Sequence, residues 1–106
     1  MAWVYLLVAG ILEVVWAYAM KLSDGFSKPV PSAVTLLAMI ASFALLSYAM
    51  RTLPLGTAYT IWTGIGAIGA FIVGIFVLGE QASVMRIGAA CLIIAGLVLM
   101  KMSSDA

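Results

Sequence analysis

A single carboxylate stands inside a long apolar segment: Glu13 interrupts the run LLVAGILEVVWAYAM, residues 6–20. If this run spans a membrane, an ionised side chain near the bilayer centre costs about 2.5 to 3.5 kcal/mol. A residue that carries such a cost usually faces the interior of a helix bundle, where a carboxylate can bind a cation or a proton. The alternative is structural, because a protonated carboxyl can also hydrogen-bond to a neighbouring helix and hold the two together.

Aromatic and small side chains are spaced so that they can surround Glu13. Within its own segment, the residues three and four positions away share its helix face, and these residues are small or aromatic. Two later apolar segments contribute a hydroxyl group and an aromatic pair that lies on one face. The expected site-lining residues are Gly10, Trp16, Ser42, Tyr59 and Trp62.

The chemistry of such a group is cation binding, because the carboxylate compensates the positive charge and the ring faces attract it. The Ser42 hydroxyl can orient the Glu13 carboxylate or accept a hydrogen bond from the bound cation. For Tyr59 and Trp62, the alternative is the aromatic belt at the membrane surface. A cation and a proton would compete for Glu13, and this competition is sufficient to couple the movement of one to the movement of the other.

The composition of the chain supports a membrane location. Of its 106 residues, 66% are hydrophobic and 8% are charged, and the mean hydropathy of +1.25 exceeds what a soluble domain of this size can bury. The net charge of +1 offers no basic patch for nucleic acid. Because histidine is absent and Cys91 is the sole cysteine, the sequence predicts neither a metal site nor a disulfide within the chain.

Four apolar segments are long enough to cross a membrane as helices. The turns between them are short; we expect Gly79 to end one helix, and Thr57 and Ser83 to cap the helices that follow them. Helices joined by such short loops pack as antiparallel neighbours. The sequence therefore predicts an all-α integral membrane protein, a single four-helix transmembrane bundle over residues 1–106, with helices at about 2–20, 31–50, 57–78 and 83–100.

The basic residues are divided almost evenly between the two sides of the membrane. Three lie on one side and two on the other, namely Lys21, Lys28 and Arg86 against Arg51 and Lys101. Because an imbalance of Lys and Arg normally sets the direction of insertion, this balance predicts insertion in both orientations. An antiparallel homodimer would then supply the inverted repeat around which many transporters are built, together with a second copy of the carboxylate.

Small residues recur in the middle of the third and fourth segments. In GAACLIIAG (88–96), Ala89 and Gly96 belong to a stripe of small residues on one helix face, which we expect to form the dimer contact. The same stripe could instead pack within one protomer. In the third segment, Gly64 and Gly66 lie mid-helix, where glycine either permits a hinge or allows another helix to approach closely.

Taken together, these motifs resemble the small multidrug resistance transporters, and the similarity extends over essentially the whole chain. It is carried by GILEVVWA (10–17), RTLPLGTAY (51–59) and AYTIWTGIG (58–66), together with the small-residue stripe of the fourth segment. Within that family, the sequence is most similar to the guanidinium exporter branch.

The resemblance implies an antiparallel, dual-topology homodimer in the bacterial inner membrane that exchanges protons for guanidinium and needs no cofactor. It implies that Glu13 binds both substrate and proton, that the site-lining residues are those given above, and that Gly64 and Gly66 form a hinge. The alternative within the family is a proton-coupled exporter of quaternary ammonium or other lipophilic cations. A third hypothesis is a membrane protein without transport activity, such as an assembly subunit or a small pore. An enzyme is not expected, because no pair of nucleophile and base accompanies Glu13.

Overall fold

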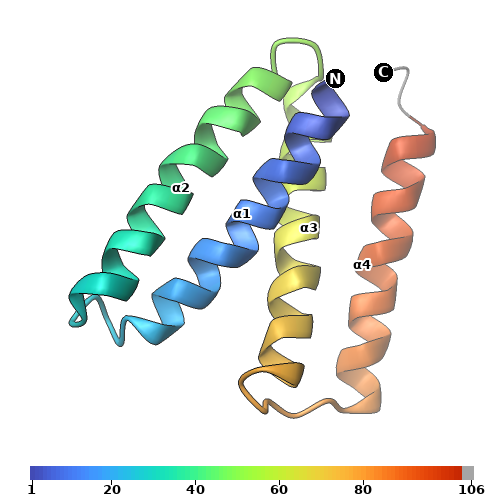
Figure 1. Ribbon diagram of the computed structural model, residues 1–106. Helices are drawn as coiled ribbons and strands as arrows, with labels where there is room; N and C mark the ends of the chain where they lie inside the picture. The colour runs from blue at the N-terminus through green and yellow to red at the C-terminus, as the bar shows by residue number, and fades with distance from the viewer. Residues whose placement is uncertain (104–106) are drawn as a thin grey trace.

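The computed structural model of the protein describes residues 1–103, so residues 104–106 of the expected domain lie outside the described part. The chain forms four α-helices in order: α1 (Ala2–Leu22), α2 (Pro29–Ala49), α3 (Leu55–Phe76) and α4 (Val84–Met102). Successive helices run in opposite directions (Figure 1), so the start of α1, the α2–α3 loop and the end of α4 lie at one end of the molecule. The α1–α2 and α3–α4 loops lie at the other end.

Two prolines determine where α2 and α3 begin. α2 starts at Pro29 rather than at residue 31, because proline at the first helical position has no amide hydrogen to leave unpaired and its φ angle suits the helix. α3 starts at Leu55 with Pro54 in the N-cap position, so the expected cap by Thr57 is wrong. α1 and α4 each continue two residues beyond the expected ends.

The α3–α4 loop follows from glycine and serine chemistry. α3 ends two residues earlier than expected. Gly79, at a φ angle of +71°, turns the chain back so that the Glu80 amide donates a hydrogen bond to the Gly74 carbonyl at 2.8 Å. Ser83 caps α4 as expected, since its hydroxyl oxygen accepts a hydrogen bond from the Arg86 amide at 3.1 Å.

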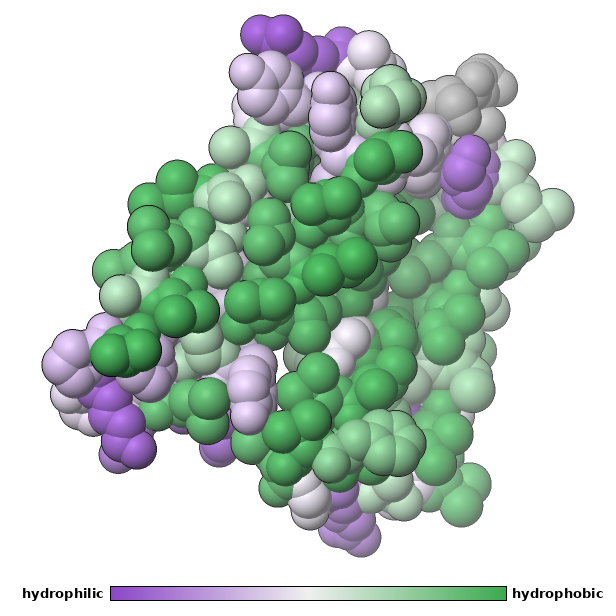
Figure 2. Space-filling view, viewed as in Figure 1, coloured by the Kyte–Doolittle hydropathy of each residue, from purple (hydrophilic) through white to green (hydrophobic). Residues whose placement is uncertain are grey.

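The surface of the molecule is that of a membrane protein. Each of the four helices is 19 to 22 residues long and apolar enough to cross a membrane. A broad hydrophobic band covers the middle of the molecule, and polar residues gather at its two ends (Figure 2). Large apolar side chains in the middle of the helices are exposed, such as Leu37, Ile40 and Leu92. Since lipid solvates such a surface and water does not, the chain is a multi-pass integral membrane protein.

α1 lies at the centre of the packing, in contact with both α2 and α3. These three helices and the α2–α3 loop share one buried cluster, which consists of Leu6, Ala9, Leu46, Ala49, Leu53, Ala58, Ile61 and Trp62. The alanines of this cluster let the helix backbones approach closely, as is common between helices in membranes. The cluster therefore fixes the relative positions of the three helices that carry the expected site.

α4 is attached differently: its backbone lies close to that of α3 alone among the described helices, and its contact with α1 is made by Lys101, whose ammonium lies 4.3 Å from the centroid of the Trp3 ring. Leu97 fills the space that Gly64 leaves on α3, where a Cβ atom would collide with the leucine side chain. Within Val84–Met102 no residue is buried. Most of the surface of α4 is therefore available for contact with lipid or with another protein.

Candidate cation-binding site

Glu13 lies on the face of α1 that packs against α3, and its side chain is half-buried. The carboxylate rests on the backbone of Gly66, where a Cβ atom would collide with Oε1 and Cδ of Glu13. Oε1 is buried, and among residues 1–103 no group donates a hydrogen bond to it. Because a buried oxygen without a donor is costly, this atom favours the binding of either a proton or a cation that carries N–H groups.

Ser42 is fully buried and links three helices. Its hydroxyl donates a hydrogen bond to the Ala9 carbonyl of α1 at 2.7 Å and accepts one from the Trp62 indole of α3 at 2.9 Å. In an α-helix, the carbonyl of Ala9 is also the acceptor for the Glu13 amide. Ser42 therefore braces the helical turn that carries the carboxylate, and neither of these two bonds reaches the carboxylate itself.

Four aromatic side chains form a row that begins one helical turn from Glu13. The ring centroids are 6.4 Å apart between Trp16 and Phe43, 5.5 Å between Phe43 and Trp62, and 5.5 Å between Trp62 and Tyr59. Trp62 is 5% exposed, so it belongs to the protein interior rather than to an aromatic belt at the membrane surface. Tyr59 is 47% exposed and stacks on Trp62.

Phe43 was not among the expected site residues, although it connects the two tryptophans. The sequence could have indicated Phe43 as a site residue, because it directly follows Ser42 in the middle of an apolar segment. An aromatic ring next to a candidate polar residue lies on a neighbouring face of the same helix. Only the packing of α2 on α1 and α3 turns this ring toward both tryptophans.

The Trp16 indole nitrogen is a second buried polar atom for which no partner lies among the described residues. It is a donor, whereas Oε1 of Glu13 is an acceptor, and the two residues are neighbours on one helix face. A cation with N–H groups satisfies the carboxylate but cannot accept a hydrogen bond from the indole. The described part of the chain therefore presents an unpaired acceptor and an unpaired donor on neighbouring residues.

The glycines near the site make close helix contacts. A Cβ atom at Gly10 would collide with the Ile65 side chain of α3, so this glycine lets α1 and α3 approach closely. Gly66 accommodates the carboxylate from α1, whereas Gly64 accommodates a leucine from α4. α3 is helical throughout its length. These contacts support the packing alternative for the two mid-helix glycines, and the hinge stays a prediction.

The expected dimer residues Ala89 and Gly96 are exposed on α4 and lie apart from the carboxylate. Gly96 borders a groove of about 460 Å³ between α3 and α4, which Thr63 and Leu97 also line. A Cβ atom at Gly96 would meet nothing within 4 Å. The dimer contact stays a prediction, and both positions are exposed in the described chain.

The bundle thus brings the expected site residues together from three helices. The carboxylate and one indole come from α1, the hydroxyl from α2, and the remaining aromatic residues from α3. Among residues 1–103, no group of three His, Cys, Asp or Glu side chains is placed to hold a metal ion. The chemistry that this geometry supports is reversible binding of a cation or a proton at one carboxylate.

Comparison with known proteins finds relatives over nearly the whole chain. The sequence model of the family described as Small Multidrug Resistance protein matches residues 1–93. Proteins named guanidinium exporter from Salmonella typhimurium, Citrobacter freundii and Yersinia pseudotuberculosis are 57%, 56% and 56% identical over 104 residues. These matches cover 98% of this chain, 99% of the Salmonella and Citrobacter relatives, and 100% of the Yersinia relative.

Proposed function

Because the chain belongs to the small multidrug resistance family, we propose that it exports guanidinium across the bacterial inner membrane in exchange for protons. The name shared by the bacterial relatives supports the substrate and the membrane. The observation that carries the proposal is the buried, unpaired Oε1 of Glu13 beside a row of aromatic rings. A carboxylate that binds either a proton or a cation supports exchange when the empty, charged site does not readily change sides of the membrane.

Guanidinium matches the chemistry of Glu13. It is planar and weakly hydrated, and its N–H donors point in fixed directions, so it can form two parallel hydrogen bonds with one carboxylate. Its flat face can lie against an aromatic ring such as that of Trp16 or Phe43. A quaternary ammonium ion has no N–H donor and would leave Oε1 unpaired, which a buried site penalises. Guanidinium is therefore the preferred cargo in this proposal.

The other expected residues act around the carboxylate. Ser42 braces the helical turn that carries it, Gly10 lets α3 approach this turn, and Trp62 with Tyr59 extends the aromatic wall. Bending of α3 at its mid-helix glycines would move this wall relative to the carboxylate, and such movement would open the site to one side of the membrane at a time.

We infer that two copies in opposite orientations form the transporter. The Trp16 indole needs an acceptor that guanidinium cannot supply, and the Glu13 carboxylate of a second copy is a suitable one. The exposed surface of α4, with Ala89 and Gly96, provides a face on which another helix can pack closely. The nearly even division of basic residues between the two ends of the bundle supports insertion in both directions.

The purified protein in liposomes is expected to couple guanidinium to protons. When guanidinium is added outside liposomes loaded with a pH-sensitive dye, the interior should become more alkaline, because protons leave as the cation enters. Tetramethylammonium at the same concentration should give a much smaller response, since it cannot satisfy the buried carboxylate oxygen. The initial rate of the dye signal for each cation is the measurement.

Three outcomes would contradict this expectation in different ways. Equal responses to the two cations would favour the quaternary ammonium alternative. Guanidinium uptake that moves no protons against their gradient would indicate a pore. The absence of a response to either cation, in protein that is folded and inserted, would favour a membrane protein without transport activity.

Cysteine labelling tests the antiparallel arrangement. In a Cys91→Ser background, Ser27→Cys places one thiol in the exposed α1–α2 loop, and a membrane-impermeant maleimide should label part of the protein from each side of the membrane. Thr52→Cys, in the loop at the opposite end, should show the same mixed pattern. If Ser27→Cys were labelled from one side of the membrane only and Thr52→Cys from the other side only, dual topology would be ruled out.

A further inference from the structure

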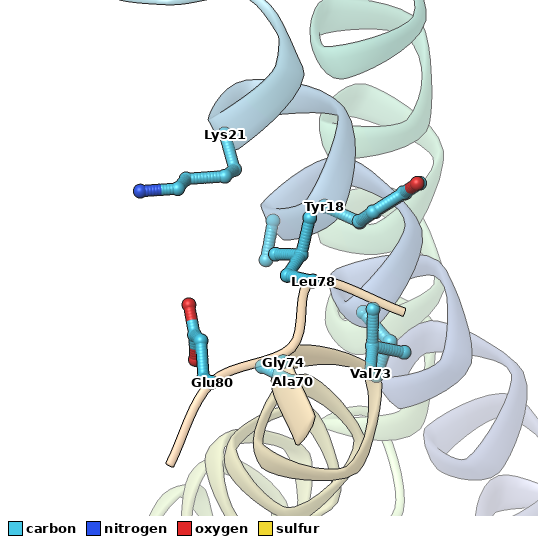
Figure 3. A pocket seen from close by; sticks show the side chains of 9 residues that line it. Tyr18, Lys21, Ala70, Val73, Gly74, Leu78 and Glu80 are labelled. Carbon is cyan, nitrogen blue, oxygen red and sulfur yellow. The ribbon is translucent and has the colours of Figure 1, made fainter. Parts of the chain in front are cut away.

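A crevice of about 180 Å³ opens between α1 and α3 at the end of the molecule opposite the start of α1 and the end of α4. Its walls are mostly apolar, formed by residues such as Val14 and Ala70, but its mouth carries two charges. Figure 3 shows Lys21 of α1 and Glu80 of the α3–α4 loop facing one another across the opening, while the Tyr18 hydroxyl points away from them. Among residues 1–103, neither charge takes part in an ion pair.

The position of Glu80 follows from two glycines. Gly79 adopts a left-handed conformation that turns the chain back after α3, and the Glu80 amide then bonds to the Gly74 carbonyl at 2.8 Å. A Cβ atom at Gly74 would occupy the place of the Glu80 carboxylate. The local structure therefore holds the carboxylate over the end of α3, at the mouth of the crevice, rather than leaving it directed into solvent.

The inner end of the crevice lies close to the cation-binding site. Val14, which follows Glu13 in α1, packs against the backbone of Gly69 of α3 and closes the crevice on that side. Ala70, on the opposite wall, is one helical turn from Gly66, against which the Glu13 carboxylate rests. The contact of Val14 with Gly69, at the wall of the crevice, therefore lies next to the contact of Glu13 with Gly66.

From this arrangement, and on the basis of the proposed function, we propose that the crevice is an access vestibule for small cations. Glu80, whose carboxylate is not engaged by Lys21, captures guanidinium at the mouth through paired hydrogen bonds. A crevice of about 180 Å³ is smaller than the pockets of roughly 300 to 1,000 Å³ that hold drug-sized ligands. The vestibule therefore favours guanidinium over bulkier cations before either reaches Glu13.

A vestibule has a kinetic signature that distinguishes it from the binding site. A fixed negative charge at the mouth raises the rate at which cations arrive, and it raises the rate at which they leave by the same factor. The equilibrium affinity at Glu13 is then unchanged. The positive charge of Lys21 repels cations. Removing it should therefore raise the rates of cation association and dissociation, whereas removing the charge of Glu80 should lower both.

Stopped-flow tryptophan fluorescence of the purified protein tests this prediction, because Trp16 lies beside the site. At low ionic strength, Glu80→Gln should slow guanidinium association about threefold to tenfold without changing the equilibrium dissociation constant, whereas Lys21→Gln should accelerate association. Asp24→Asn is the matched control, since Asp24 lies at the same end, does not line the crevice, and has a φ angle of +50° that asparagine tolerates. In about 1 M salt the differences should disappear, because the Debye length falls to about 3 Å.

The vestibule would be overturned if Glu80→Gln and Asp24→Asn had equal effects, or if Lys21→Gln also slowed association. A weakened equilibrium affinity in Glu80→Gln, with unchanged association, would overturn it as well. In each of these cases, binding of guanidinium by the wild-type protein and its loss in Glu13→Gln would still support the proposed function. Failure of the wild-type protein to bind guanidinium would instead refute the proposed function itself.

Discussion

Replacing Glu13 with glutamine is expected to abolish guanidinium binding and proton coupling together, while the protein still inserts and folds. Glutamine preserves the size of the side chain and can still rest on Gly66, but it carries no charge for the cation and binds no proton. Truncating one partner of a buried charged pair costs about 2 to 5 kcal/mol, so guanidinium affinity should fall by at least about 30-fold. Fluorescence titration and liposome transport measure the two losses.

The wild-type protein provides the matched comparison. Its apparent guanidinium affinity should fall as the pH is lowered, because protons then occupy the oxygen that the cation needs. Any residual binding in Glu13→Gln should not depend on pH. Elution from size-exclusion chromatography in detergent should be the same for both proteins. Uphill transport in the mutant, or a wild-type affinity that stays constant between acidic and neutral pH, would contradict a shared carboxylate.

Replacing Gly66 with alanine should cause the second largest loss. The new Cβ atom would occupy the place of the Glu13 carboxylate and would also collide with Cγ, and because this side chain is flexible, it can turn away as a whole at little cost in stability. Alanine also favours the helix over glycine by about 1 kcal/mol, so the melting temperature should not fall. A carboxylate displaced by about 1 Å can lower the transport rate by about 100-fold. Thermal unfolding and initial transport rates are the measurements.

Gly56→Ala is the control for this substitution on the same helix. Gly56 lies near the start of α3, and a Cβ atom there would meet nothing within 4 Å. Transport by Gly56→Ala should therefore match that of the wild-type protein. If Gly66→Ala transported at the wild-type rate, the close contact between α3 and the carboxylate would have no role in binding. A Gly66→Ala protein with unchanged affinity and slow turnover would instead support the hinge.

The membrane class, the four helices and the central carboxylate could be predicted from the sequence alone, because each depends on local composition. In lipid, a chain must satisfy its backbone hydrogen bonds within the segment, so a run of about 20 apolar residues becomes a helix almost regardless of its neighbours. An acidic residue inside such a run stands out by its cost alone. Helical spacing then identified Trp16 as a neighbour of Glu13, and the structure keeps the two on one face of α1.

What the tertiary structure alone decided is which helix face meets which neighbour. Gly64 and Gly66 are two residues apart, yet one receives a leucine from α4 and the other the carboxylate from α1. Ser42 bonds to Ala9 rather than to Glu13, and Phe43 turns toward two tryptophans. These contacts depend on the rotation of each helix about its own axis. Packing between side chains far apart in the sequence sets that rotation, whereas the spacing of residues within one helix shows only which of them share a face.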